Sequence, residues 1–327
     1  MKIRLLTLAV MAVIGLNMAG TAQEKTSFKA SGKPTFKIFS NYHSTITDGK
    51  TYNQFELTRA YLGYQHQFSE NWSGKLIFDV GNPKDGGGLE MTAYVKNALL
   101  SYKKDAWTVN FGMISTTSFK TQEKFWGYRY LLKSFQDEYK FGASADLGIS
   151  AAYKFNDKLS ADLILINGEG YKKLEQDSIF TIGAGITLRP LEQLALRGYF
   201  ETTTKDEGAI KRQNSLALFA GYQLKKLSIG AEFNKQFNHG MEEGLDMTGY
   251  SFYSTLKLKA SKLFARFDML ESENDWNAAK DGNLFVLGAE FNPVKGIKIS
   301  PNYRNFSPSA TGSAKVDYIY VNCEIKF

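Results

Sequence analysis

Apolar and polar residues alternate along most of this 327-residue chain, in short segments separated by polar connectors. In the final segment one parity is apolar and the other is polar: Ile319, Val321, Cys323, Ile325 and Phe327 against Tyr318, Tyr320, Asn322, Glu324 and Lys326. Side chains of a β-strand point alternately to its two faces. The pattern therefore predicts strands with one face suited to lipid and the other suited to water.

Sixteen segments carry this alternation, and we expect a strand in each. They cover residues 35–44, 54–68, 72–81, 92–103, 107–114, 147–155, 158–167, 178–189, 193–203, 213–224, 227–237, 249–259, 263–271, 283–291, 297–306 and 316–327. Two of them fit less well. Lys96 and Asn97 place two polar residues side by side, and Ile164 and Ile166 fall on the predicted water face. Each case indicates either a β-bulge or residues packed beneath an inward loop.

The connectors between these segments alternate in length throughout. Short connectors cover residues 69–71, 104–105, 156–157, 190–192, 225–226, 260–262 and 292–296, and long polar ones cover 45–53, 82–91, 168–177, 204–212, 238–248, 272–282 and 307–315. Outer-membrane barrels have short periplasmic turns and long outer loops. We therefore predict an all-β, antiparallel transmembrane barrel. A two-sheet sandwich would also alternate, but it would close its core within fewer residues.

The first residues predict export. Lys2 and Arg4 precede an apolar run over residues 5–16, and small residues follow at 20–22, so we expect a signal peptide over residues 1–22. A membrane anchor is the weaker interpretation because the run is too short to span a bilayer and no cationic flank follows it. Residues 23–34 would then be a short periplasmic segment, and residues 35–327 the barrel.

Composition agrees with a β-barrel and excludes several other classes. Aromatic residues make up 14% of the chain, prolines number only 6, and after the signal no apolar run approaches the roughly 20 residues of a transmembrane helix. Cys323 is the only cysteine, so no internal disulfide forms. The sequence has no basic cluster suited to nucleic acid and no regular metal-ligand spacing, so we expect neither partner and no cofactor.

The longest break in the pattern covers residues 114–146. It mixes eight aromatic with five basic residues and lacks sustained period two. If the N-terminus is periplasmic, the connector between the fifth and sixth strands is the third outer loop. We predict that this loop folds into the barrel and narrows it.

Three segments and the C-terminus resemble a known family. Residues 55–81, FELTRAYLGYQHQFSENWSGKLIFDVG, are similar to the second hairpin of the phosphate-selective porin O and P family. Residues 97–112, NALLSYKKDAWTVNFG, resemble its next hairpin, and residues 145–153, ADLGISAAY, the strand after its constriction loop. Phe327 is similar to the signal read by the barrel-assembly machinery. The resemblance implies a 16-stranded outer-membrane porin, often trimeric, with its third outer loop inside the lumen.

Charged residues at the narrowest part of such a barrel set its selectivity. Candidates on the loop are Lys120, Lys124, Arg129, Lys133 and Lys140, opposed by Glu123, Asp137 and Glu138. Candidates on the wall, placed by parity, are Arg59, Lys75, Arg189, Arg197, Arg266 and Arg304, with Asp79, Asp162, Glu201, Glu232, Asp268 and Glu324. The alternative for each is a solvated lumen residue or a structural ion pair. The loop aromatics could stack on a solute, but we favour a role in attaching the loop to the wall.

These features predict an outer-membrane channel for passive diffusion of small hydrophilic solutes, with a mild preference for anions. No dense lysine or arginine ladder is apparent, which argues against phosphate specificity. An alternative is a closed barrel that serves as a scaffold or receptor in a surface or secretion complex. An outer-membrane hydrolase is disfavoured because the three histidines lack a nearby serine and carboxylate arrangement.

Overall fold

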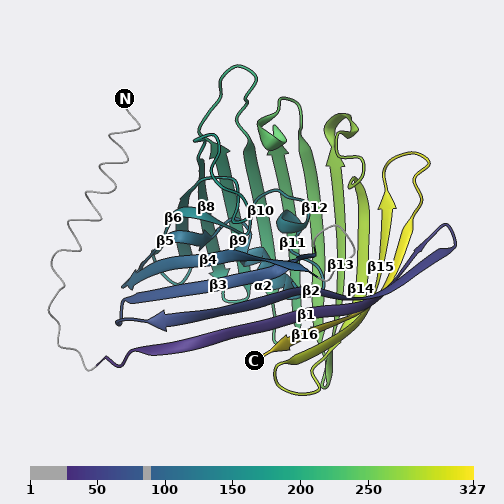
Figure 1. Cartoon of the computed structure of the whole chain (residues 1–327), viewed down its shortest axis with the longest axis horizontal. Coiled ribbons are helices and arrows are strands. Elements are labelled where there is room, and N and C mark those ends of the chain that lie inside the picture. The colour runs from purple at the N-terminus through teal and green to yellow at the C-terminus, as the bar shows by residue number, and fades with distance from the viewer. Residues whose placement is uncertain (1–27, 84–89) are drawn as a thin grey trace.

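One closed ring of antiparallel strands makes up the molecule. A computed structural model describes residues 28–83 and 90–327; the predicted signal peptide lies outside these ranges. Sixteen strands among the described residues pair each with the next, and β1 pairs with β16 to close the barrel (Figure 1). The predicted fold class and strand number are confirmed.

The strands are bounded as follows: β1 Ser31–Thr47, β2 Lys50–Gln67, β3 Trp72–Pro83, β4 Met91–Lys104, β5 Trp107–Ser115, β6 Ala145–Lys154, β7 Leu159–Ile166, β8 Thr181–Leu191, β9 Leu194–Thr203, β10 Asn214–Gln223, β11 Leu227–Phe237, β12 Met247–Lys257, β13 Ser261–Ser272, β14 Gly282–Phe291, β15 Ile297–Pro308 and β16 Val316–Lys326. Helices α2 (Lys120–Trp126) and α3 (Phe135–Glu138) lie between β5 and β6, and short 3₁₀ turns η1 (His239–Met241) and η2 (Glu273–Asp275) lie in later connectors.

The two faces of each strand have the predicted character. On β12, Phe252 is 52% exposed on the outside, whereas Ser251 is 0% exposed on the inside. On β16, Ile319 and Val321 are exposed and Asn322 is buried. No helix among the described residues is both long and apolar enough to cross a bilayer.

The prediction of a long connector over residues 45–53 is wrong. β1 and β2 continue pairing through Thr47 and Lys50, leaving only Asp48 and Gly49 as the turn, both with positive φ. Aspartate and glycine are the residues that such a two-residue hairpin turn prefers. Polar side chains do not prevent this extension, because pairing requires only backbone groups. β1 also begins at Ser31, before the predicted start at residue 35.

The two irregular segments have different explanations. At Lys96 the β3–β4 register shifts, so Lys96 is a bulge residue and points inward along with Asn97. Ile164 and Ile166 lie in a regular register and are buried in one cluster with Ile114. A bulge therefore accounts for the first segment, and internal packing accounts for the second.

Candidate pore constriction

The connector between β5 and β6, residues 116–144, folds inside the barrel, and we refer to it as L3. Helix α2 lies against the inner face of β10 and β11. At its base, the Thr116 hydroxyl donates to the Ala143 carbonyl at 2.5 Å, and Lys96 Nζ on β4 donates to Ser144 Oγ at 3.0 Å. The first bond holds the two ends of L3 together, and the second attaches one end to the wall.

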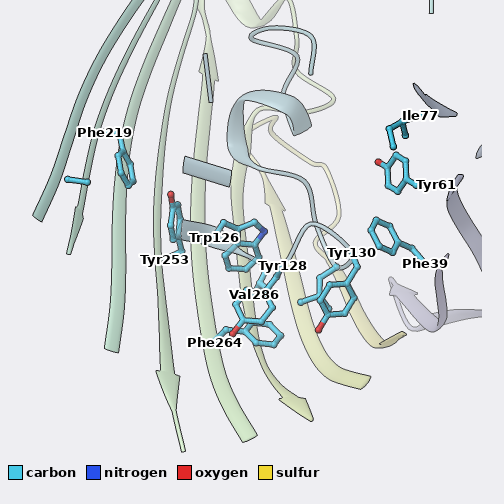
Figure 2. Close-up of a cluster of buried hydrophobic side chains, with 12 residues drawn as sticks. Phe39, Tyr61, Ile77, Trp126, Tyr128, Tyr130, Phe219, Tyr253, Phe264 and Val286 are labelled. Carbon is cyan, nitrogen blue, oxygen red and sulfur yellow. The ribbon is translucent and has the colours of Figure 1, made fainter. Parts of the chain in front are cut away.

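Aromatic side chains attach L3 to the wall opposite its base. Trp126 packs edge-on against Tyr253 of β12, with ring centroids 5.7 Å apart, and Tyr128 lies 4.5 Å from Phe264 of β13. All four rings are buried, and Figure 2 shows them together on the inner face of these strands. The predicted role of the loop aromatics as attachment residues is consistent with this packing.

A second aromatic contact depends on a glycine in the wall. Phe135 of α3 is 0% exposed and packs in a cluster that includes Tyr139 and Phe141. A Cβ atom on Gly249 of β12 would lie only 2.2 Å from Phe135 Cζ. The absence of a side chain at residue 249 therefore creates the space that the ring occupies.

Three wall arginines hold the backbone of L3. Arg197, Arg266 and Arg304 donate to the carbonyls of Thr117 (2.9 Å), Lys133 (2.6 Å) and Leu131 (3.0 Å), respectively. Two of them are also paired with carboxylates: Arg197 with Asp162, and Arg266 with Asp268. Parity predicted that these arginines face inward, and they do. However, L3 covers them, and Arg266 is only 1% exposed.

Within L3, Arg129 joins the two helices. Its guanidinium donates to Glu123 Oε2 at 2.8 Å and also to Asp137. Burial opposes the charge on Asp137, but Arg129 and Lys133 outweigh it and lower the pKa of that carboxyl. Both carboxylates are therefore engaged by Arg129, which offsets one of their two negative charges.

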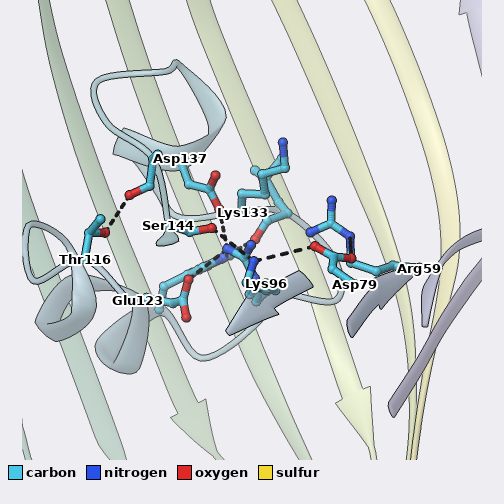
Figure 3. A network of polar contacts seen from close by, with 12 residues as sticks. Arg59, Asp79, Lys96, Thr116, Glu123, Lys133, Asp137 and Ser144 are labelled. Atoms are coloured by element: carbon cyan, nitrogen blue, oxygen red, sulfur yellow. Dashed lines mark hydrogen bonds and ion pairs between the residues drawn. The ribbon is translucent and has the colours of Figure 1, made fainter. Parts of the chain in front are cut away.

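The wall formed by β2, β3 and β4 faces this part of L3. Asp79 on β3 is buried and pairs with Arg59 at 3.2 Å and with Lys96 at 3.6 Å. Figure 3 shows this group pointing toward Lys133 and the acidic residues of L3. Arg129 lies within electrostatic range of Arg59 and Lys96. The two sides together form a group of charged residues, which we refer to as the candidate constriction.

Several lysines at the constriction form no ion pair among the described residues. Lys120 and Lys124 are exposed on α2, and Lys120 lies within electrostatic range of Lys75 on β3. Asp162 and Glu123 are also within electrostatic range of Lys120. Lys133 extends from the L3 segment between the helices. Within residues 28–83 and 90–327, none of these four lysines forms an ion pair. Their positive charges are therefore not compensated by an ion pair.

The remaining candidates lie elsewhere. Lys140 is exposed and lies near His239 and Lys280, in the long connectors, and Glu138 is close to Lys280 as well. Arg189 is exposed near the end of β8, next to a short turn. Among the acidic candidates, Glu201 and Glu232 are buried, and Glu324 pairs with Lys298 at 2.8 Å.

Sequence reasoning missed two contributors. The sequence marks Lys96 only as a break in strand alternation. In the structure its ammonium group bonds to Ser144 of L3 and pairs with Asp79 of β3. The connector between β7 and β8 also reaches the constriction, since Tyr171 donates from its hydroxyl to Asp79 at 2.6 Å. The paired polar residues Lys96 and Asn97 were a signal for the first, whereas no periodicity indicated the second.

Comparison with solved structures finds porins and related channels. The anion-selective porin from Comamonas acidovorans has a TM-score of 0.69 at 10% identity, over 91% of this chain and 100% of the porin. OprB of Pseudomonas putida has a TM-score of 0.70 at 10% identity, over 90% and 94%. The outer-membrane channel DcaP of Acinetobacter baumannii has a TM-score of 0.63 at 14% identity, over 94% and 100%.

No protein-family model matches the sequence, and no curated protein matches it either. The solved structures nevertheless agree with the closed antiparallel barrel over nearly its whole length. The chain therefore has the sixteen-stranded barrel fold of the outer-membrane porins.

Proposed function

We propose that this protein is an outer-membrane porin through which small hydrophilic solutes diffuse passively, with a preference for anions. The observation that carries the proposal is the set of four lysines at the constriction that form no ion pair among the described residues: Lys75, Lys120, Lys124 and Lys133. The outward band of apolar side chains supports a position in a membrane. The sequence signal at residues 1–22 supports export.

The preference for anions follows from how the charges are arranged. Acidic residues also line the constriction, but Glu123 and Asp137 are held by Arg129, and Asp79 is shared by Arg59 and Lys96. Two unit charges 8 Å apart in water interact by about 0.5 kcal/mol, which corresponds to about a twofold change in local ion concentration. Each unpaired lysine should therefore favour anions by about that factor.

A general preference for anions fits these residues better than recognition of phosphate, because carboxylates are interspersed among the cations. The similarity of residues 55–81 and 97–112 supports membership of the phosphate-selective porin O and P family and, through it, a trimer. A scaffold or receptor barrel with a closed lumen is the competing function, and the same experiment distinguishes the two.

The purified protein, reconstituted in planar bilayers, should produce stepwise conductance and a zero-current potential of anionic sign in a potassium chloride gradient. Replacing Lys75, Lys120 and Lys124 together by Gln should lower the anion-to-cation permeability ratio by at least about twofold. The matched control replaces Lys158, Lys225 and Lys226, which are exposed in short turns. A silent bilayer with an intact barrel by circular dichroism would reject the channel. A cation-selective wild type would reject the anion preference alone.

A further inference from the structure

The connector between β7 and β8, residues 167–180, bends toward the constriction, and we refer to it as the L4 arm. Asp146 at the start of β6 fixes the bend, because its Oδ2 atom accepts from the backbone N–H groups of Gly168 (2.8 Å) and Gly170 (3.1 Å). Both glycines have positive φ, at 114° and 77°. A residue with a Cβ atom rarely adopts these conformations.

Tyr171 then attaches the arm at two points. Its backbone N–H donates to the Ala145 carbonyl at 3.0 Å, and its hydroxyl donates to Asp79 Oδ2 at 2.6 Å. The first contact is to β6, which pairs with β7, the strand from which the arm starts, and the second is to β3. Because Asp79 also pairs with Arg59 and Lys96, the hydrogen bond from Tyr171 holds this part of the arm beside the constriction.

Lys172 projects from this anchored position. Its Nζ atom lies 4.8 Å from the centroid of the Tyr94 ring and 5.8 Å from that of Tyr171. Lys96, Lys133 and Arg59 are within electrostatic range of it. Lys172 is exposed and forms no ion pair in the described part of the chain. A ring face attracts an ammonium group without neutralising its charge, so the amine remains able to bind an anion.

The adjacent Lys173 provides an internal comparison. It carries the same charge and is also exposed. Among the described residues its side chain has no hydrogen bond, ion pair or ring contact, and only its backbone N–H bonds to the Gly170 carbonyl, at 3.3 Å. The two lysines therefore differ in position relative to the constriction and not in charge.

We propose that the L4 arm is a second element of the constriction and that Lys172 binds oxyanion solutes, carrying a carboxylate or phosphate group, before they pass to Lys133. This rests on the proposed channel function and adds a selectivity residue outside L3. The amine supplies three N–H donors. The cations around it hold more positive charge than Asp79 alone can balance.

Zero-current potentials in potassium acetate and potassium phosphate gradients test the proposal. Lys172→Gln should reduce the anion-to-cation permeability ratio by about twofold in both salts, and Lys173→Gln should leave it unchanged. Equal losses in the two variants, or no loss in Lys172→Gln, would overturn the proposal. A loss with only one of the two salts supports it and restricts the solute class to that group.

A charge-neutral variant tests the position of the arm. Gly170→Val introduces a β-branched residue at positive φ, and its Cβ would lie 3.0 Å from Ala143 Cβ, so the arm must move. It should reproduce the loss seen in Lys172→Gln, with the barrel confirmed by circular dichroism. Wild-type selectivity in this variant would overturn the positioning role. A silent wild-type protein would instead overturn the channel function itself.

Discussion

Replacing Gly249 by Ala should displace α3 of L3 from the wall. The new methyl group would lie 2.2 Å from Phe135 Cζ and 2.6 Å from Phe135 Cε1, whereas real Cβ atoms do not approach this closely. Phe135 is fully buried, so its ring cannot move aside within the cluster without disturbing Tyr139, Phe141, Met247 and Leu270. The ring, and the short helix that carries it, must leave this position or push the strand outward.

The magnitude follows from the burial of one aromatic side chain. Exposing a fully buried Phe costs about 2 to 3 kcal/mol. This corresponds to a shift of about 30- to 150-fold toward the undocked form of L3. The hydrogen bonds from Arg197 and Arg304 to L3 remain, so we expect partial release of the loop and not loss of the barrel.

Two assays report the release. Trypsin should cleave L3 at Lys133 or Lys140 faster than in the wild type, and single-channel records should show frequent transitions to a higher conductance. Gly198→Ala is the matched control, because a Cβ there would contact only Leu218 Cδ2, at 3.8 Å. If Gly249→Ala resembled Gly198→Ala in both assays, the steric argument would be refuted. Combining Gly249→Ala with Phe135→Leu should restore slow cleavage by shortening the side chain that clashes.

Two further predictions concern L3 as a whole. Deleting residues 120–140 should raise the single-channel conductance, because the segment lies within the barrel; an unchanged conductance would place it outside. L3 should also stay docked from pH 8 to about pH 5, because the pKa of Asp137 is lowered in the folded protein. The ion pair between Asp137 and Arg129 is therefore complete above the ordinary aspartate pKa of about 4 and is lost only as the pH falls further. Conductance recorded from pH 8 down into strong acid should become unstable only below the ordinary aspartate pKa, and an onset near pH 6 would contradict the assignment.

Much of the fold could be predicted from the sequence because the signals are local. Strand parity depends only on a period of two, and it placed Ser251 inside and Phe252 outside. The one wrong connector shows the limit of this reasoning. Residues 45–53 are polar, but the Asp48–Gly49 turn allows the backbone to keep pairing beyond the apolar band. The turn signal was present in the sequence and was outweighed by composition.

The candidate site was only partly predictable, because it depends on contacts between distant segments. Aromatic and basic composition identified residues 114–146 as a loop with a special role. It could not indicate that Phe135 would need Gly249, or that Tyr171 would reach Asp79. These pairs are far apart in sequence and share no periodicity.

The sequence by itself determined the barrel, the inward or outward direction of most strand residues and the identity of the inward loop, since period two and connector length are properties of neighbouring residues. The bulge at Lys96 is an exception, because only the structure shows it. Only the tertiary structure decided which inward charges a solute can meet. The alternation within their strands places both Arg266 and Lys75 on the inward face. L3 nevertheless covers Arg266 and leaves Lys75 without an ion pair among the described residues. The physical reason is that the path of L3 across one wall is set by packing and backbone hydrogen bonds from distant strands. Which charges remain exposed is therefore a consequence of where the loop docks.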